Sequence, residues 1–385
     1  MKKKLLSVLL VAAMVSSVFV GCGSSSSDGN SSDATATEGD SEYRIAMITD
    51  SGDITDQSFN QTTFEACEAF SKETGADFQY FKPTANTDDD RIAAFENAVA
   101  EGYNVVVCPG YLFAAMIAEV ADDYPEVTII ALDCSEGDFA DAGMTEIPEN
   151  VCAFTYQEEL AGYMAGYAAV KEGYTKLGFL GGIAVPAVIR YGYGFVEGCN
   201  EAAVELGNES DVEVNYVYGG QFQGDEAITA TMDSWYSNGT EVVFACGGGI
   251  FTSACEAAVK ADGKVIGVDV DQSATIDTQY DSEGLCITSA MKGLAATVEA
   301  TLTDVFAGKW SDHAGQIQNL GLVSGTDASL NYVQLPTDTW TMQNFTVDDY
   351  NTLVASMYDG TIKVDVDIEK MPETSIKVTE YDNIH

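Results

Sequence analysis

The chain carries one pattern twice, as VVVCPGYLFAAMIAEVADDYPEVTIIALD at Val105–Asp133 and as VVFACGGGIFTSACEAAVKADGKVIGVD at Val242–Asp269. In each copy an apolar run meets a turn with cysteine and glycine, then an alanine-rich helical stretch, a short polar break and a second apolar run. Each copy ends with an aspartate. This order predicts a strand–helix–strand unit with parallel strands, and two copies predict two similar α/β lobes.

The rest of the chain alternates in the same way. Short apolar runs predict ten strands: Tyr43–Ile48, Asp77–Phe81, Val105–Cys108, Val127–Leu132, Val151–Phe154, Leu177–Leu180, Val212–Val217, Val242–Ala245, Val265–Val268 and Cys286–Ser289. Longer periodic stretches predict helices between them: Thr62–Thr74, Asp88–Glu101, Ala114–Asp123, Leu160–Lys171, Tyr193–Glu205, Gly224–Asn238, Thr252–Ala261 and Gly293–Ala307. Such alternation is typical of parallel sheets covered by helices on both faces.

Three aspartates stand where predicted strands end: Asp50, Asp133 and Asp269. In open parallel sheets a ligand binds beyond the carboxyl ends of the strands, so two lobes that face each other would direct these acids into one cleft. A carboxylate accepts hydrogen bonds from two adjacent hydroxyls, which makes Asp133 and Asp269 suited to a polyol. The alternative is that each acid caps its own loop.

The stretch TDSGDITDQSFNQTTFEA, Thr49–Ala66, follows the first predicted strand and runs into a helix. We expect Ser58 to be the helix N-cap, with its hydroxyl accepting from backbone N–H groups. Phe59 and Asn60 then lie at the helix entrance, facing the cleft. A phenyl face beside an amide that both donates and accepts suits a flat heteroaromatic ring, although Phe59 could instead cover the core beneath its own loop.

The second lobe offers a matching aromatic residue. Phe222 lies in GGQFQGDEA, Gly219–Ala227, between a predicted strand and a helix, so a planar ligand could stack between Phe222 and Phe59. The alternative is a phenylalanine that packs its own loop. The glycine turn CGGGI, Cys246–Ile250, permits close approach of backbone to a ligand. Neither GxxxxGK[ST] nor GxGxxG occurs there, which favours an uncharged group over a phosphate.

Lys292 stands in TSAMKG after a strand that we expect to return to the first lobe. Its ammonium group could donate to a ligand hydroxyl and offset the aspartates, or it could be a solvated lysine at a helix start. Asp271 is expected to cap the next helix. The two histidines, His313 and His385, lie outside the predicted strand-end loops.

The first 42 residues form no part of this pattern. Lys2, Lys3 and Lys4 precede an apolar run that ends at Gly21, and Cys22 follows, so residues 1–22 resemble a lipoprotein signal peptide in which Cys22 becomes lipidated. An uncleaved membrane anchor is the alternative. Residues 23–42 are almost without apolar side chains and are expected to form a flexible tether.

Charge and cysteine content exclude several functions. The chain has 17 Lys and Arg against 61 Asp and Glu, and three of the basic residues precede Cys22, so the remainder carries a formal charge of −47. Such a surface repels nucleic acid. Eight of the nine cysteines follow Cys22 without a CxxC spacing, and their apolar surroundings favour buried free thiols. With only two histidines, no zinc site or other cofactor is expected.

Eight segments carry a resemblance to a known family: MITDSGDITDQSFNQ (47–61), ALD (131–133), GYMAGYAA (162–169), LGFLGGIAVPAV (177–188), YGYGFVEG (191–198), GGQF (219–222), IGVDVDQ (266–272) and SAMK (289–292). Over about residues 43–325 the chain resembles the basic membrane protein family of bacterial lipoproteins, the purine-nucleoside-receptor-like (PnrA-like) substrate-binding proteins of ABC transporters. The resemblance implies a type I periplasmic-binding-protein fold, with two Rossmann-like lobes joined by three hinge crossings.

With that fold we expect an N-terminal lobe of residues 43–154 plus about 288–320. The C-terminal lobe would hold residues 155–287 plus about 321–385. Carried over by motif, the resemblance implies eight ligand-binding residues: Asp50, Phe59, Asn60, Asp133, Phe222, Gly248, Asp269 and Lys292. It places a base between the two phenylalanines with Asp50 and Asn60 on its edge, and ribose against the other four.

The leading hypothesis is therefore a monomeric, lipid-anchored receptor outside the cell that binds nucleosides by hinge closure and passes them to an ABC permease. A receptor or sensor for a sugar or another small polar molecule is the main alternative, although two aromatic faces around an amide favour a base. A nucleoside-cleaving enzyme is disfavoured because the sequence has no G-x-S-x-G motif, zinc ligand set or cluster of metal-binding acids.

Overall fold

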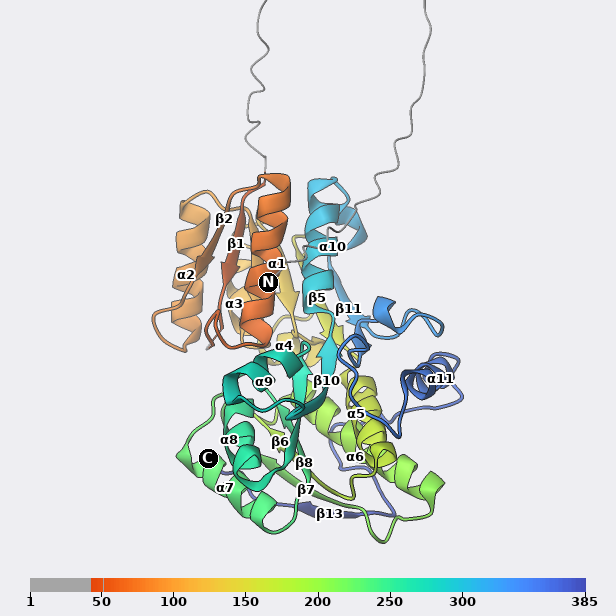
Figure 1. Ribbon diagram of the computed structural model, residues 1–385. Helices are drawn as coiled ribbons and strands as arrows, with labels where there is room; N and C mark the ends of the chain where they lie inside the picture. Colours follow the sequence, from red (N-terminus) through yellow and green to blue (C-terminus); the bar gives the residue numbers. More distant parts are fainter. Residues whose placement is uncertain (1–42, 51) are drawn as a thin grey trace, which may run out of the picture. The chain divides into compact units, whose positions relative to one another are not determined.

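A computed structural model of the protein describes residues 43–50 and 52–385 (Figure 1). The expected signal peptide, Cys22 and the expected tether lie outside the described residues. Two β-sheets form the framework, each in a lobe of its own, and all strand pairs but one are parallel. The sequence prediction of two parallel α/β lobes is confirmed. No helix in the described part has the length and apolar character needed to cross a membrane.

The first sheet has the strand order β11-β5-β4-β3-β1-β2. Its strands are β1 (Ile45–Ile48), β2 (Phe78–Phe81), β3 (Val105–Pro109), β4 (Thr128–Leu132), β5 (Val151–Tyr156) and β11 (Gln316–Leu320). The central strands are buried along nearly their whole length, as parallel strands covered on both faces must be.

The second sheet has the order β12-β10-β9-β8-β6-β7-β13. Its strands are β6 (Lys176–Gly181), β7 (Glu213–Tyr218), β8 (Val242–Cys246), β9 (Lys264–Asp269), β10 (Cys286–Lys292), β12 (Val333–Gln334) and β13 (Lys377–Glu380). Only β12 runs antiparallel to its neighbour, β10. The order 10-9-8-6-7 reproduces 5-4-3-1-2 of the first sheet, so the repeat seen in the sequence extends over five strands per lobe.

The chain passes between the lobes three times: after β5, after β10 and after β11. The first lobe thus holds residues 43–156 and 293–320, and the second holds 157–292 and 321–385. The boundary expected at residues 287 and 288 lies too early, because β10 pairs with β9 as far as Met291 and ends at Lys292. The strand before Lys292 therefore belongs to the second sheet, and the chain returns to the first lobe only after it.

Helices cover both faces of the sheets. Those of the first lobe are α1 (Phe59–Thr74), α2 (Asp88–Ala100), α3 (Phe113–Val120), α4 (Glu136–Asp141) and α10 (Leu294–Phe306). Those of the second are α5 (Glu158–Glu172), α6 (Pro186–Leu206), α7 (Glu226–Ser237), α8 (Phe251–Ala261), α9 (Ser273–Tyr280) and α11 (Val347–Tyr358), and short 3-10 turns span Trp310–Asp312 and Ala328–Leu330. The sequence did not predict α4, α11 or the last three strands, and it indicated α9 only through the expected cap at Asp271. Asp271 Oδ1 accepts from the Ser273 N–H at 3.1 Å, although Gln272 is the N-cap residue of α9.

Helices α5 and α6 touch backbone to backbone. A Cβ atom added to Gly162 would lie 2.1 Å from the carbonyl oxygen of Tyr191, and one added to Gly166 would lie 2.1 Å from that of Phe195. Gly194 and Gly198 of α6 make the reciprocal approach to α5. The glycines in GYMAGYAA and YGYGFVEG are thus explained by close helix packing, which fixes the first turns of both helices beside the cleft.

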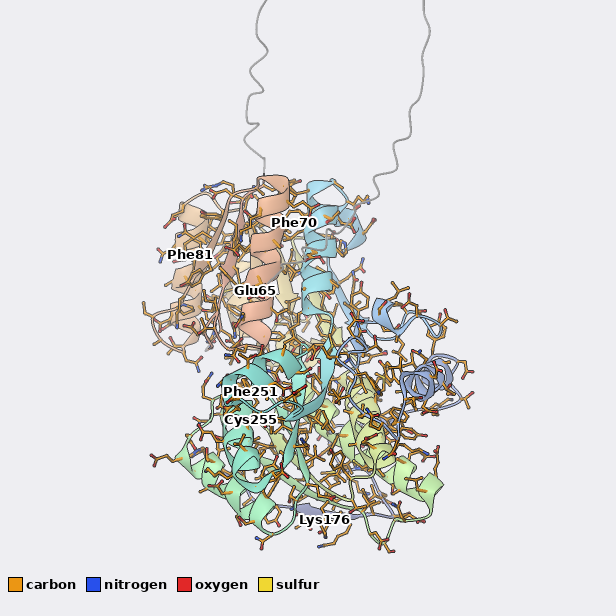
Figure 2. All side chains as sticks on the ribbon, viewed as in Figure 1. Glu65, Phe70, Phe81, Lys176, Phe251 and Cys255 are labelled. Carbon is orange, nitrogen blue, oxygen red and sulfur yellow. The ribbon has the colours of Figure 1, made fainter. Side chains whose placement is uncertain are left out.

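Buried apolar side chains pack between the helices and the sheets. Figure 2 shows all described side chains on the ribbon, with Phe70 labelled on α1. Phe70 of α1 contacts Phe306 of α10, with ring centroids 5.0 Å apart, and so joins two elements far apart in the sequence. All eight cysteines of the described part are free and buried, which confirms the prediction of buried thiols: Cys67, Cys108, Cys134, Cys152, Cys199, Cys246, Cys255 and Cys286.

Candidate ligand-binding site between the two lobes

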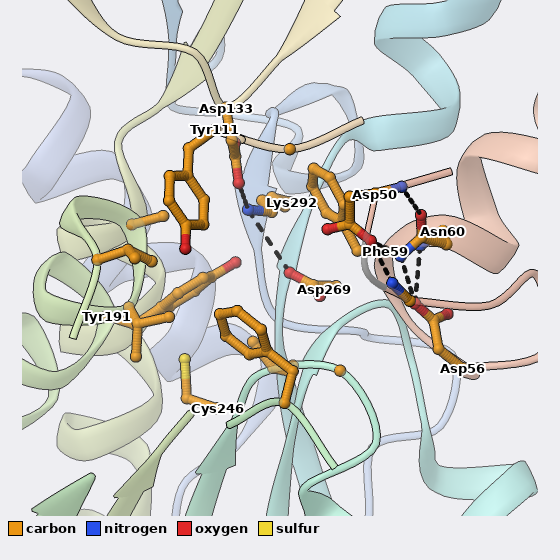
Figure 3. Close-up of a pocket in the computed structure, with 18 of the residues that line it drawn as sticks. Asp50, Asp56, Phe59, Asn60, Tyr111, Asp133, Tyr191, Cys246, Asp269 and Lys292 are labelled. Atoms are coloured by element: carbon orange, nitrogen blue, oxygen red, sulfur yellow. Dashed lines mark hydrogen bonds and ion pairs between the residues drawn. The ribbon is translucent and has the colours of Figure 1, made fainter. Parts of the chain in front are cut away.

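A cavity lies where the carboxyl ends of the strands of both lobes meet (Figure 3). The space open to the centres of water molecules is about 90 Å³, several times the roughly 10–15 Å³ that one buried water requires. All eight residues predicted from the sequence line this cavity: Asp50, Phe59, Asn60 and Asp133 from the first lobe, and Phe222, Gly248, Asp269 and Lys292 from the second. The fold therefore brings together residues up to 242 positions apart in the chain.

Two of the acids occupy equivalent positions in the two lobes. Asp133 follows β4 and Asp269 ends β9, which is the last strand of each sequence repeat. Both adopt a left-handed backbone conformation, with φ of 58° and 67°. Aspartate tolerates this region better than most residues, and such conformations concentrate at functional sites. The shared backbone turn carries both carboxylates into the cavity.

The entrance of α1 differs from the prediction. The carboxylate of Asp56, not the Ser58 hydroxyl, caps the helix: it accepts from the backbone N–H groups of Ser58, Asn60 and Gln61 at 2.9–3.0 Å. The Ser58 hydroxyl makes no cap hydrogen bond and donates instead to the carboxylate of Asp269. Ser58 is the N-cap residue by position, as predicted, but the prediction that its hydroxyl makes the cap was wrong, because the sequence gives no sign of this contact with the other lobe.

Asn60 holds Asp50 in place. Its amide nitrogen donates to Oδ1 of Asp50 and to Oδ2 of Asp56, both at 3.0 Å (Figure 3). Because both amide hydrogens are engaged, Asn60 has only its oxygen left for a ligand, and that oxygen already accepts weakly from the Asp50 backbone at 3.4 Å. Oδ1 of Asp50 also accepts from the Gly52 backbone at 2.6 Å, which leaves Oδ2 facing the cavity beside Gly110.

Lys292 lies at the centre of a buried cluster. Its ammonium nitrogen is 2.5 Å from Oδ2 of Asp133 and 3.7 Å from Oδ1 of Asp269 (Figure 3). Oε1 of Glu158 lies 3.6 Å from the same nitrogen. The ring of Phe59 lies 4.7 Å from the nitrogen, in the range of a cation–π contact. The Lys292 side chain is only 4% exposed, so the alternative of a solvated lysine is excluded.

Burial sets the electrostatics of this cluster. It raises the pKa of Asp50 and of Asp269, since water no longer solvates the charged form, although Lys292 opposes the rise at Asp269. Burial likewise raises the pKa of Glu158, which lies at the first hinge crossing. Burial alone would lower the pKa of Lys292, but the neighbouring carboxylates outweigh it and place the pKa above its ordinary value. Lys292 therefore stays charged.

The turn that carries Phe222 packs against two glycine-bearing turns. A Cβ on Gly182 would lie 2.4 Å from the Phe222 ring, and one on Gly247 would lie 2.8 Å from it. Gly248 has a φ of 52°, and the Gly249 N–H donates to the Phe222 carbonyl at 2.8 Å. The glycine run therefore serves first to seat Phe222, and it also leaves Gly248 open to the cavity.

Other residues of the site were not predicted. Tyr111 and Tyr191 line the cavity, and Glu158 reaches Lys292 from the start of α5. Tyr111 follows the Cys-Pro-Gly turn that the repeat pairs with the CGGG turn, so the repeat offered a signal for it. Oδ1 of Asp133 and the hydroxyl of Tyr191 are buried without a hydrogen-bond partner in the described chain. Both are free to bond a ligand.

The described residues contain no group of three or more His, Cys, Asp or Glu side chains suited to hold a metal ion. A cleft between two lobes that is lined by aromatic rings, unsatisfied polar atoms and acids is typical of a solute-binding protein.

Residues 44–364 match the Bmp family model, described as ABC transporter substrate-binding protein PnrA-like, and the chain belongs to this family. Its function is accordingly substrate binding for an ABC transporter rather than catalysis.

Individual relatives agree with this assignment. The chain is 27% identical to the ABC transporter nucleoside-binding protein BmpA of Lactococcus lactis subsp. cremoris, over 71% of this chain and 75% of that protein. It is 30% identical to the CD4+ T-cell-stimulating antigen of Listeria monocytogenes, over 80% of this chain and 85% of that protein. The crystal structure of an ABC transporter solute-binding protein from Aeropyrum pernix K1 has the same fold, with a TM-score of 0.65. The two chains are 21% identical, and the match covers 83% of this chain and 87% of that one.

Proposed function

We propose that the protein binds nucleosides in the cavity between its lobes, with the base held between the rings of Phe59 and Phe222. The observation that carries the proposal is the presence of these two rings, one from each lobe, in one cavity that also holds strand-end acids. Stacking on aromatic rings contributes about 1–3 kcal/mol per base in nucleic-acid binders. A Lactococcus relative is named as a nucleoside-binding protein, which supports the same ligand class.

The edge of the base would meet Asp50. Asp50 Oδ1 is engaged with the Gly52 N–H and the Asn60 amide, so Oδ2 is the oxygen that accepts an N–H of the base. Asn60 would act mainly by fixing the orientation of this carboxylate. Such support keeps the acceptor in one place before the ligand arrives, which lowers the entropy lost on binding.

The ribose would meet the cluster around Lys292. Asp133 has an unpaired buried oxygen, and Asp269 lies on the opposite side of the ammonium group. Together the two carboxylates can accept from the 2′ and 3′ hydroxyls while Lys292 donates, and the backbone at Gly248 permits close approach. The surplus of acids over bases around the cavity favours an uncharged nucleoside over a nucleotide, whose phosphate would be repelled.

Hinge motion would couple binding to enclosure. Three side-chain hydrogen bonds are among those that join the lobes in the described state: the Ser58 hydroxyl donates to Asp269, the Gln272 amide donates to the Gln57 carbonyl at 3.0 Å, and Lys292 donates to Asp133 at 2.5 Å. An open form would admit the ligand, and only the closed form would give it contacts to both lobes.

Delivery would take place at the outer face of the membrane. The signal-like residues 1–22 and Cys22 support a lipid-anchored, extracytoplasmic protein that presents its ligand to an ABC permease, with residues 23–42 as a tether. We propose that the receptor acts as a monomer, because each chain has both lobes of the site.

Thermal unfolding of the chain from Tyr43 to His385 tests the proposal with adenosine, guanosine, inosine, cytidine, uridine, free bases, ribose and galactose. At 100 times its dissociation constant a ligand adds about 2.7 kcal/mol to the free energy of unfolding, and thus a few degrees to Tm. The expected result is a shift with nucleosides that is lost in Phe59→Ala and in Phe222→Ala. A shift with ribose or galactose alone would overturn the nucleoside assignment and favour a sugar receptor.

A further inference from the structure

Strand β13 and the residues after it lie outside the part of the chain that matches the family model, which ends at residue 364. β13 pairs in parallel with β7, from Lys377 opposite Glu213 to Glu380 opposite Tyr216. It has no counterpart in the first sheet, where β2 is the edge strand. The addition of β13 at this edge thus breaks the symmetry of the two lobes (Figure 1).

The segment 381–385 continues along β7 to the cavity end of the sheet. The Tyr381 N–H donates to the Tyr216 carbonyl at 2.8 Å, and the Ile384 N–H donates to the Tyr218 carbonyl at 3.0 Å. Tyr218 is the last residue of β7, and the turn that follows, residues 219–225, carries Phe222. The segment therefore ends beside the turn that places one of the two cavity phenylalanines.

His385 contacts this turn at both ends. At its start, a Cβ on Gly220 would lie 2.8 Å from the His385 carbonyl oxygen and 2.9 Å from its Cβ atom, so the two backbones are in close contact. At its end, Nε2 of His385 lies 2.7 Å from Oδ2 of Asp225. The same oxygen accepts from the Gln221 amide at 2.8 Å, which ties the two ends of the turn together.

Asp225 also fixes the helix that follows. Its Oδ1 accepts from the backbone N–H groups of Ala227 and Ile228, both at 2.9 Å, as the N-cap of α7. One carboxylate thus joins the turn, the helix and His385. Between these anchors, Phe222 is supported by the glycine turns after β6 and β8, but the outer side of its turn is supported by His385.

We propose that His385 is a positioning residue for ligand binding: it clamps the turn 219–225 from outside and thereby holds the Phe222 ring against the ligand. The inference rests on the proposed function, because it assigns Phe222 a role in stacking. It adds to that function a residue outside the family match, on the far side of the turn from the cavity.

Two measurements on His385→Ala test the proposal. The first is amide hydrogen exchange of the ligand-free protein, which we expect to become faster at residues 219–225 and to stay unchanged at residues 56–61, the turn that carries the other cavity phenylalanine, Phe59. The second is nucleoside affinity by calorimetry, which we expect to fall by about three- to tenfold, less than in Phe222→Ala.

Matched variants separate positioning from general stability. His385→Gln retains a side-chain N–H that can reach Asp225 and should restore most of the affinity. Tyr381 lies on the same segment as His385 but away from the turn, and its hydroxyl donates to Asn215 at 3.3 Å. Tyr381→Phe removes this hydroxyl and should leave nucleoside affinity unchanged. In a Phe222→Ala background, His385→Ala should cause no further loss, because the ring that it positions is gone.

Two results would overturn the proposal. The first is that residues 219–225 exchange as slowly in His385→Ala as in the wild type. The second is that His385→Ala lowers nucleoside affinity as much in the Phe222→Ala background as in the wild type. If the wild-type protein binds no nucleoside, the proposed function fails, and the exchange experiment still decides whether His385 clamps the turn.

Discussion

Replacing Lys292 with methionine should destabilise the protein far more than replacing an exposed lysine. Methionine keeps most of the length of the side chain, so the change removes the charge without opening a large cavity. Asp133, Glu158 and Asp269 would then share a buried site without their common cation. Lys260→Met is the control, because Lys260 pairs with Asp233 at the surface and its side chain is 58% exposed.

The magnitude follows from burial. Removal of one partner from a buried ion pair costs about 3–5 kcal/mol, whereas an exposed pair contributes about 0–1 kcal/mol. A body of about 340 residues has an unfolding entropy of roughly 0.7 kcal/mol/K at Tm, so we expect Lys292→Met to lower Tm by about 4–7 °C. Lys260→Met should lower Tm by no more than about 1.5 °C.

The loss of thermal stability in Lys292→Met should increase with pH. Burial already raises the pKa of Glu158 and Asp269 in the folded protein, and without Lys292 the folded-state pKa values rise further. A carboxyl whose pKa is higher in the folded state contributes its full stability below its unfolded pKa, near pH 4, and loses it as pH rises through the folded pKa. The gap in Tm between wild type and Lys292→Met should therefore widen from pH 5 to pH 8.

Thermal unfolding followed by circular dichroism at pH 5, 6, 7 and 8 measures both effects. The reasoning is refuted if Lys292→Met is as stable as Lys260→Met at pH 8, or if its deficit stays constant over the range. A constant deficit would mean that lost packing, and not the uncompensated carboxylates, determines the role of Lys292.

Three further outcomes follow from the structure. Gly166→Ala should lower stability by about 1–3 kcal/mol because its Cβ would lie 2.1 Å from a backbone oxygen of α6, whereas Gly137→Ala, with 3.6 Å to its nearest neighbour, should be neutral or stabilising in thermal unfolding. Asp56→Ala should speed hydrogen exchange at the first turn of α1 and Ser58→Ala should not, since the carboxylate makes the cap. Burial raises the pKa of all eight described cysteine thiols, so their alkylation should be slow in the native protein and complete after denaturation. Mass spectrometry measures the alkylation, and rapid labelling of the native protein would contradict this expectation.

The sequence predicted the fold well because its main signals are local. Runs such as Val105–Cys108 are apolar throughout, as buried parallel strands require, and the helices between them are periodic. The repeat then predicted two lobes. The prediction of strands failed beyond residue 307, because β11 and β13 are edge strands with half-buried or exposed residues that depend on a partner strand, and β12 is an edge strand of only two residues.

The site was predictable to the extent that it lies at strand ends. Asp133 and Asp269 could be placed because a parallel sheet delivers the carboxyl ends of its strands to one edge. The residues that contact the site from far along the chain could not be predicted. The contact of Ser58 with Asp269 spans 211 positions, and His385 reaches Asp225 over 160, so neither follows from spacing, propensity or the repeat. Burial of Lys292 among three acids likewise became evident only from the geometry.

The positions of these contacts relative to the hinge suggest how closure is balanced. Glu158 follows the first crossing by two residues and Lys292 directly precedes the second, so their contact lies beside the hinge and should persist when the lobes part. Away from the hinge, closure then depends on the Ser58–Asp269 and Gln57–Gln272 hydrogen bonds, which together contribute about 2–4 kcal/mol. The Lys292–Asp133 hydrogen bond also joins the lobes, but it lies beside the second crossing. A shift from mostly open to mostly closed requires about 5.5 kcal/mol. These hydrogen bonds already count in the ligand-free equilibrium, so the ligand's contacts with both lobes must supply that shift, which is the condition for a receptor that closes on its ligand and can still release it.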